Sequence, residues 1–173
     1  DIGGGSLEIA VGEDEEPDNA VSLPLGAGSL TRRFIREDPP QESEIKALRK
    51  YVRLEVAATA SMLSKGEKPR VFVGTSKTLK QLARIAGAKE SSAGPYADRR
   101  LTLQGVQESI SRLSSLPDSQ RKQISGVSTG RSGQLLAGAL VAEAAMQLFH
   151  AEELAICPWA LREGVILRAL DAL

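Results

Sequence analysis

The sequence has little of several residues that mark common classes of protein. Cys157 is the only cysteine, so no intramolecular disulfide can form, and we expect a small buried side chain in a reducing compartment. His150 is the only histidine, with no suitable neighbour at ligand spacing, so we expect no histidine-based metal site. Aromatic residues make up only 3% of the chain, which leaves the core to valine, isoleucine, leucine and alanine.

An excess of charge and a long apolar run are also missing. The 22 acidic residues balance the 22 basic ones, which gives no electrostatic case for binding nucleic acid or an anionic membrane. No run reaches the roughly 20 apolar residues that cross a bilayer, and the N-terminus does not resemble a signal peptide. We therefore expect one cytoplasmic domain, residues 1–173, with no nucleic-acid and no membrane partner.

The most informative stretch is residues 1–9, which read DIGGGSLEI. Three consecutive glycines allow positive φ angles and can turn backbone N–H groups toward a tetrahedral anion. The alternation of apolar residues after them predicts a strand, which argues against a flexible linker. The carboxylates of Asp1 and Glu8 can hold Mg²⁺ or direct a water molecule at phosphorus. The expected phosphate-binding residues are Gly3, Gly4, Gly5 and Ser6.

A second candidate site follows the apolar run at residues 70–73, which we expect to be a short buried strand. Gly74, Thr75 and Ser76 lead from it into a helix, so their free N–H groups and hydroxyls can face a phosphate. The spacing fits a simple helix N-cap equally well. The stretch is no Walker A loop, because that motif needs an earlier glycine.

The remaining pattern predicts a hairpin followed by helices that alternate with single strands. This order is typical of a ribonuclease-H-like α/β layer with a mixed sheet. The interval 86–100 is expected to be a surface loop, and the apolar run 132–149 a helix buried on most sides. The expected strands are 7–11, 20–25, 70–73 and 152–157, and the expected helices 30–34, 43–63, 101–116, 132–149 and 160–170.

Four stretches resemble one known family. DIGGGSLEI is similar to the DIGGGSxE motif of the Ppx/GppA phosphatases, which are exopolyphosphatases and guanosine pentaphosphate phosphohydrolases of the actin, sugar-kinase and heat-shock ATPase superfamily. Ser22–Ala27 with the following Leu30 and Thr31 resembles its segment SLPLGAxRLT. Val71–Ser76 resembles its second strand and turn, and Trp159–Ile166 its LREGV signature. The resemblance extends over nearly the whole chain.

The resemblance implies an α/β, ribonuclease-H-like fold with a mixed sheet and flanking helices. It also implies that residues 1–173 are the C-terminal half of a two-domain enzyme whose N-terminal domain, with a further catalytic glutamate, is absent from this sequence. The family hydrolyses terminal phosphoanhydrides, so the implied substrates are polyphosphate or guanosine pentaphosphate. A homodimer is left open by the sequence.

For the mechanism we expect Glu8 to activate the attacking water and Asp1 to position Mg²⁺. Two alternatives remain: a kinase of the same superfamily, and a non-catalytic module that senses polyphosphate or guanosine tetraphosphate. One departure from the resemblance is that Arg131-Ser132-Gly133 replaces an Arg-Ala-Asp found in many relatives, which removes a carboxylate.

Overall fold

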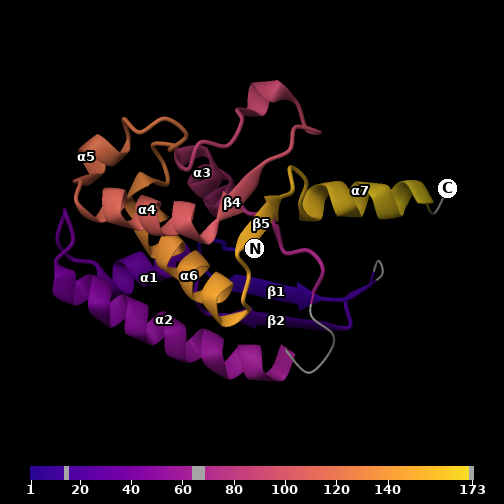
Figure 1. The fold of residues 1–173 in the computed structure, drawn as a ribbon, viewed down its shortest axis with the longest axis horizontal. Coiled ribbons are helices and arrows are strands. Elements are labelled where there is room, and N and C mark those ends of the chain that lie inside the picture. Colours follow the sequence, from indigo (N-terminus) through magenta and orange to yellow (C-terminus); the bar gives the residue numbers. More distant parts are fainter. Residues whose placement is uncertain (14–15, 64–68, 172–173) are drawn as a thin grey trace.

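The computed structural model describes residues 1–13, 16–63 and 69–171. Its first part is a β-hairpin followed by two helices (Figure 1). The two strands pair antiparallel, with Leu7 opposite Leu23 and Val11 opposite Asn19. The strand and helix patterns of this region are therefore confirmed to within a few residues. The elements are β1 (Leu7–Val11), β2 (Asn19–Leu23), α1 (Ala27–Phe34) and α2 (Glu42–Leu63).

The second part contains a separate three-stranded sheet and the remaining helices. The strand order is β3-β5-β4, with β5 parallel to β3 and antiparallel to β4, so the predicted mixed sheet is present. The first hairpin forms its own two-stranded sheet beside it. The elements are β3 (Val73–Gly74), α3 (Lys77–Ile85), η1 (Ser91–Ala93), β4 (Arg100–Thr102), α4 (Leu103–Ser114), α5 (Asp118–Arg121), η2 (Ser132–Gln134), α6 (Leu135–Leu148), β5 (Glu153–Ile156) and α7 (Leu161–Asp171).

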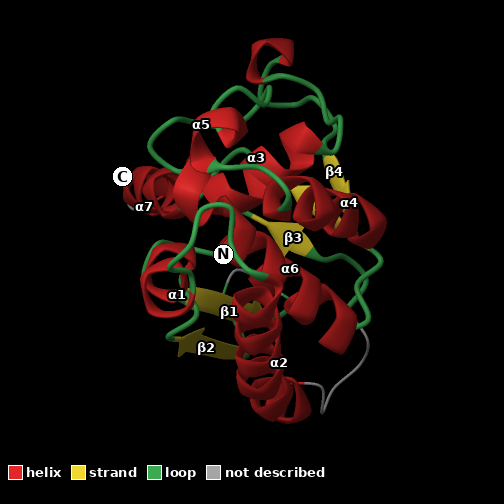
Figure 2. Ribbon diagram, turned by 90° about the vertical axis from the view of Figure 1, so that its left-hand side faces the viewer, coloured by secondary structure: helices red, strands yellow, loops and turns green. Residues whose placement is uncertain are grey.

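Helix α6 forms the centre of the fold, as its apolar sequence predicts. Eleven of its 14 residues are buried, and it packs against α1, α2, α3 and α4. Figure 2 shows it between α2 and the layer that holds β3. Gly138 allows α3 to approach α6 closely, because a Cβ atom at Gly138 would overlap the side chain of Thr78 in α3. Small residues along α6 thus let four helices converge on it.

Three expectations about the second part were wrong. The buried strand expected at 70–73 is only β3 at Val73–Gly74, and Val71 and Val73 are 63% and 54% exposed. Cys157, expected to be buried, is partly exposed. The residues of strand β4 were expected to be the end of a loop and the start of a helix. The strand has only three residues, of which only Leu101 is buried, and this is too short for an alternating apolar pattern to show in the sequence.

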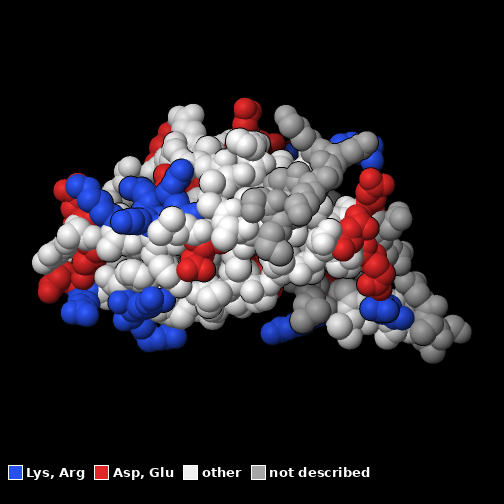
Figure 3. Space-filling view, turned by 90° about the horizontal axis from the view of Figure 1, so that it is seen from below, with Lys and Arg blue, Asp and Glu red and all other residues white. Residues whose placement is uncertain are grey.

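Two features describe the surface of the protein. Side chains of both charges are mixed on it, and one helix exposes several large apolar side chains. Positive and negative side chains are interspersed on the face seen in Figure 3. Helix α7 extends away from the rest of the protein in Figure 1. Four of its large apolar residues are 58–60% exposed: Val165, Ile166, Leu167 and Leu170.

None of the helices in the described ranges combines the length and hydropathy needed to cross a membrane. The expected acidic turn at 12–18 and the end of the long helix at 66–69 lie partly outside the described residues.

Candidate active site

The glycine loop is the turn of a small hairpin. Ile2 forms an antiparallel bridge with Leu7, and Asp1 and Glu8 exchange two backbone hydrogen bonds of 2.8 and 2.9 Å. The N–H of Gly3 donates to the Ser6 carbonyl oxygen at 2.9 Å and closes the turn. The loop therefore has a defined conformation, unlike a flexible linker.

Helix α1 holds this loop through the loop's carbonyl groups. The N–H groups of Ala27 and Ser29, in the first turn of α1, donate to the Gly3 and Gly4 carbonyls at 2.9 and 3.0 Å. The first N–H groups of a helix have no partner within it, so the loop satisfies them. Gly26 makes the close approach possible, since a Cβ atom there would overlap the backbone of Gly5. The carbonyls of the loop thus face α1.

The loop's remaining N–H groups are available to a ligand. Within the described part of the chain, the N–H groups of Gly4, Gly5 and Ser6 have no acceptor. Gly4 and Gly5 are exposed, and a Cβ atom on either would meet nothing within 4 Å. The positive φ that we expected the glycines of this loop to adopt is wrong, because among the described glycines only Gly87, Gly94 and Gly126 have it. The protein itself therefore gives no steric reason for glycine at positions 4 and 5, whereas an anion bound at the N–H groups would.

Two carboxylates stand beside the loop on the same face of the hairpin. Asp1 and Glu8 are directly opposite each other, and such pairs project to one side with Cβ atoms about 5 Å apart. The Ser6 hydroxyl, expected to bind phosphate, donates to Glu8 Oε1, as does the Ser22 hydroxyl at 3.2 Å. Both bonds use the same oxygen, so Oε2 of Glu8 has no donor among the described residues.

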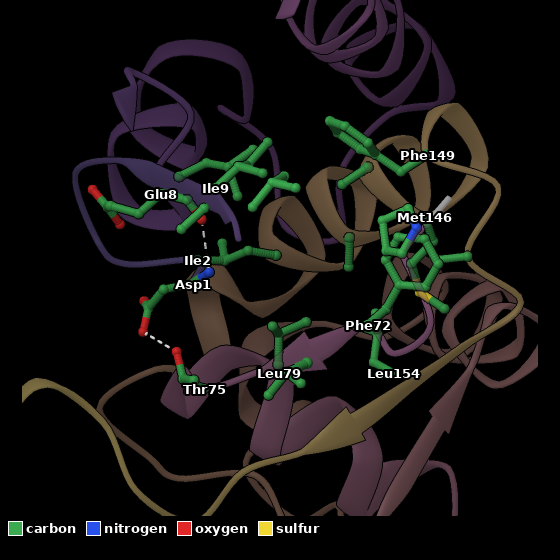
Figure 4. A pocket seen from close by; sticks show the side chains of 18 of the residues that line it. Asp1, Ile2, Glu8, Ile9, Phe72, Thr75, Leu79, Met146, Phe149 and Leu154 are labelled. Atoms are coloured by element: carbon green, nitrogen blue, oxygen red, sulfur yellow. Dashed lines mark hydrogen bonds between the residues drawn. The ribbon is translucent and has the colours of Figure 1, made fainter. Parts of the chain in front are cut away.

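The turn between β3 and α3 meets the hairpin through one contact. The Thr75 hydroxyl donates to the Asp1 carboxylate at 2.7 Å (Figure 4). Ser76 is buried, and its side chain accepts the Leu79 N–H at 3.1 Å, so the structure favours the N-cap alternative for this residue. Gly74 is also buried, and a Cβ atom on it would lie 2.8 Å from the Leu79 side chain. Of the three candidates in this turn, only Thr75 reaches the glycine hairpin.

An apolar groove of about 780 Å³ lies between the hairpin and the exposed edge of β3. Asp1, Glu8 and Thr75 line it, and Figure 4 shows both carboxylates toward one end of it. Most other lining side chains are apolar, among them Ile2, Ile9, Phe72, Leu79, Met146 and Phe149. The groove was missed in the sequence because its walls come from segments far apart in the chain. Its apolar part offers nothing to a phosphate, so the polar chemistry is confined to the end with the carboxylates.

The donors present fit a magnesium ion that is also bound by substrate. In residues 1–13, 16–63 and 69–171 there is no group of three or more histidine, cysteine, aspartate or glutamate residues arranged to hold a metal. Mg²⁺, however, is commonly held by one or two carboxylates together with water and substrate phosphates. Asp1 meets that requirement, because Thr75 occupies only its Oδ2.

Comparisons with known proteins agree on one family. The family model for the Ppx/GppA phosphatase family matches residues 1–173. The chain is 49% identical to Exopolyphosphatase 1 of Mycobacterium leprae over 172 residues, which are 99% of this chain and 51% of that protein. It is 32% identical over 145 residues to Exopolyphosphatase 2 of Mycobacterium tuberculosis, covering 83% of this chain and 44% of the relative.

Solved structures show the same fold. The crystal structure of the Aquifex aeolicus member of the Ppx/GppA family superposes with a TM-score of 0.84 at 25% identity, over 99% of this chain and 55% of that one. An exopolyphosphatase from Cytophaga hutchinsonii superposes with the same TM-score at 21% identity, over 99% of this chain and 56% of that one. The chain spans about half the length of the curated relatives that it matches.

Proposed function

This chain belongs to the Ppx/GppA phosphatase family, and we propose that it is the C-terminal half of a two-domain hydrolase that releases phosphate from the end of polyphosphate or from guanosine pentaphosphate. One observation carries the proposal: three backbone N–H groups without acceptors in the described chain stand beside two carboxylates held by hydroxyl groups. Such an arrangement can bind a phosphate and direct a water molecule at it.

The terminal phosphate binds to the N–H groups of Gly4, Gly5 and Ser6 in this proposal. The N–H of Gly3 contributes to the turn instead, since it already donates to Ser6. Because the donors are fixed by the hairpin and by α1, they need not reorganise as negative charge shifts between phosphate oxygens. Phosphoryl transfer depends chiefly on such positioning and charge stabilisation.

Glu8 is the proposed base for the attacking water. Two hydroxyl groups hold its Oε1 and leave Oε2 to accept a proton. The water oxygen bonds to the terminal phosphorus as the bridging P–O bond breaks, the water proton passes to Oε2, and the shortened chain leaves with the bridging oxygen. The family resemblance adds a second glutamate from the other domain.

Asp1 is the proposed magnesium-binding residue, with Thr75 as its support. The hydrogen bond from Thr75 fixes Oδ2 and leaves Oδ1 toward a cation. Bound Mg²⁺ would supply positive charge that offsets the charge of the phosphate oxygens. The proposed location is the cytoplasm, where Cys157 stays reduced.

The other half of the enzyme has two surfaces to cover in this proposal. One is the apolar groove between the hairpin and β3, and the other is the exposed apolar side of α7. Large exposed apolar surfaces of this kind are typical of interfaces. We therefore expect residues 1–173 alone to release phosphate poorly, whereas rates equal to those of the complete protein would contradict the two-domain proposal.

The proposed activity is tested with the complete protein, magnesium and polyphosphate of defined length. Release of one orthophosphate at a time, stopped by chelation of the metal, is the expected result. Guanosine pentaphosphate assayed in parallel shows which phosphoanhydride is preferred. Transfer of phosphate to or from a nucleotide would identify a kinase instead, and binding without any release would identify a sensing module.

A further inference from the structure

Ser22 lies directly opposite Glu8 in the antiparallel pair of β1 and β2. The neighbouring pair, Leu7 and Leu23, faces the core, since Leu7 is buried and Leu23 packs against the core residues. Successive side chains of a strand point to opposite faces, so Glu8 and Ser22 both project from the other face of the hairpin. Opposed residues have Cβ atoms about 5 Å apart. The pairing of the strands therefore places the Ser22 hydroxyl beside the Glu8 carboxylate.

Among the described residues, the only donors to the Glu8 carboxylate are two hydroxyl groups. Ser22 donates to Oε1 at 3.2 Å, and Ser6 donates to the same oxygen. No lysine or arginine side chain in the described ranges forms an ion pair with Glu8. A cation there would stabilise the charged carboxylate and reduce its tendency to accept a proton. The hydroxyl groups orient Glu8 without adding a positive charge beside it.

The two hydroxyl groups differ in what else they can bind. Ser6 belongs to the glycine loop, and its own N–H is one of the three that have no acceptor in the described chain. A phosphate bound at that N–H lies next to the Ser6 side chain, so rotation about the Cα–Cβ bond can turn the hydroxyl toward it. Ser22 lies outside the loop, in the paired strand β2. A bound phosphate therefore competes with Glu8 for the hydroxyl of Ser6 but not for that of Ser22.

We propose that Ser22 is the positioning residue of Glu8: it keeps Oε1 in place when a phosphate binds and the Ser6 hydroxyl turns from Glu8 to that phosphate. This inference rests on the proposed functions of the glycine loop and of Glu8. With Oε1 held, Oε2 stays directed at the attacking water. Ser22 itself contacts neither the water nor the phosphate, so its loss changes the rate and leaves substrate binding intact.

The test compares Ser22→Ala, Ser22→Thr and the control Asn19→Ala in the complete protein, with polyphosphate as substrate and orthophosphate as a competitive inhibitor. Asn19 is an exposed polar residue of the same strand that pairs with Val11. We expect Ser22→Ala to lower kcat about tenfold and to leave KM and the orthophosphate inhibition constant within about twofold. Ser22→Thr keeps the hydroxyl and should restore most of the rate, whereas Asn19→Ala should not change it. An unchanged kcat in Ser22→Ala, or an equal loss in Asn19→Ala, would overturn the proposal.

A double variant shows whether Ser22 acts through Glu8. Ser22→Ala should lower kcat little further in a protein that already carries Glu8→Gln, because the group that Ser22 positions is no longer a base. The same tenfold loss in both backgrounds would show that Ser22 acts independently of Glu8 and would overturn the proposal. Near-normal turnover of Glu8→Gln alone would instead contradict the proposed function of Glu8.

Ser6→Ala tests the other half of the proposal. We expect KM and the orthophosphate inhibition constant to rise about fivefold, because the bound phosphate loses one hydroxyl donor. The fall in kcat should be smaller than in Ser22→Ala, since Ser22 still holds Glu8. Unchanged KM and inhibition constant in Ser6→Ala would show that its hydroxyl does not turn to phosphate. Failure of orthophosphate to inhibit any of the proteins would count against the loop as the phosphate site.

Discussion

The hydroxyl group of Thr75 donates a 2.7 Å hydrogen bond to the carboxylate of Asp1, which lies 74 residues earlier in the chain. This bond links the turn between β3 and α3 to the glycine hairpin. No other hydrogen bond or ion pair holds the Asp1 carboxylate among the described residues. The orientation of the proposed magnesium-binding residue therefore depends on Thr75.

Thr75→Val removes the hydroxyl group and keeps the size of the side chain. We expect kcat to fall about tenfold, and the magnesium concentration for half-maximal rate to rise, because Asp1 loses its orienting donor. Thr75→Ser keeps the hydroxyl and is the control. Steady-state rates over a range of magnesium concentrations check this. An unchanged magnesium dependence in Thr75→Val would show that Thr75 does not affect magnesium binding.

Gly4→Val should abolish phosphate binding without destabilising the protein. A Cβ atom at Gly4 meets nothing within 4 Å, and the residue is not among those with positive φ. The valine methyl groups would instead occupy the space next to the free N–H groups. In an NMR titration with phosphate, the amide signals of residues 3–6 should move in the unsubstituted complete protein and should not move in Gly4→Val. Binding that survives it would place the anion elsewhere.

Gly26→Ala, unlike Gly4→Val, is expected to destabilise the protein. The new methyl group would overlap the backbone of Gly5 and Ser6, which cannot move away as a flexible side chain could. Overpacking of this kind costs about 1–3 kcal/mol of unfolding free energy. Urea denaturation measures the loss, and an unchanged midpoint would show that the loop and α1 are less closely packed than described.

Glu8→Gln should retain substrate binding and lose most of the rate. Removal of a general base commonly lowers kcat by a factor of about 100 to 10,000. The amide keeps the shape of the side chain and can still accept from Ser6 and Ser22 through its oxygen. Both kcat and KM are measured in the complete protein. Near-normal turnover would make Glu8 a surface residue, and a joint loss of binding and rate would make it a metal ligand.

Asp38→Ala tests a buried arginine remote from the site. The Arg121 side chain is only 3% exposed, and its Nη2 lies 3.4 Å from Asp38. Asp38 also accepts the N–H of Asp118 at 2.8 Å. Loss of these partners should cost about 2 kcal/mol of unfolding free energy, because the buried guanidinium loses the carboxylate of Asp38 and keeps only the weaker electrostatic interaction with Asp118. Urea denaturation is the measurement, with Glu37→Ala on the exposed neighbour as control.

Local pattern was enough to predict the strand after the glycine loop and the central helix. The alternation after Gly5 and Ser6 requires a strand with one buried face, and the apolar run of α6 requires burial on most sides. The side chains beside the loop were also predicted, since Asp1 and Glu8 are close to it in sequence. Such features involve residues within one or two turns of each other, where composition and spacing decide the outcome.

By itself, then, the sequence determined the local elements, the glycine loop and the family, because short-range spacing carries that information. Only the tertiary structure decided which groups meet at the site. In the folded protein Ser76 caps α3, and the Thr75 hydroxyl donates to the Asp1 carboxylate. The tertiary structure also left Val71 and Val73 exposed, where the sequence predicted a buried strand. These outcomes depend on contacts between segments far apart in the chain. Such contacts leave no periodic pattern in the sequence, and they form only when helices and sheets pack together.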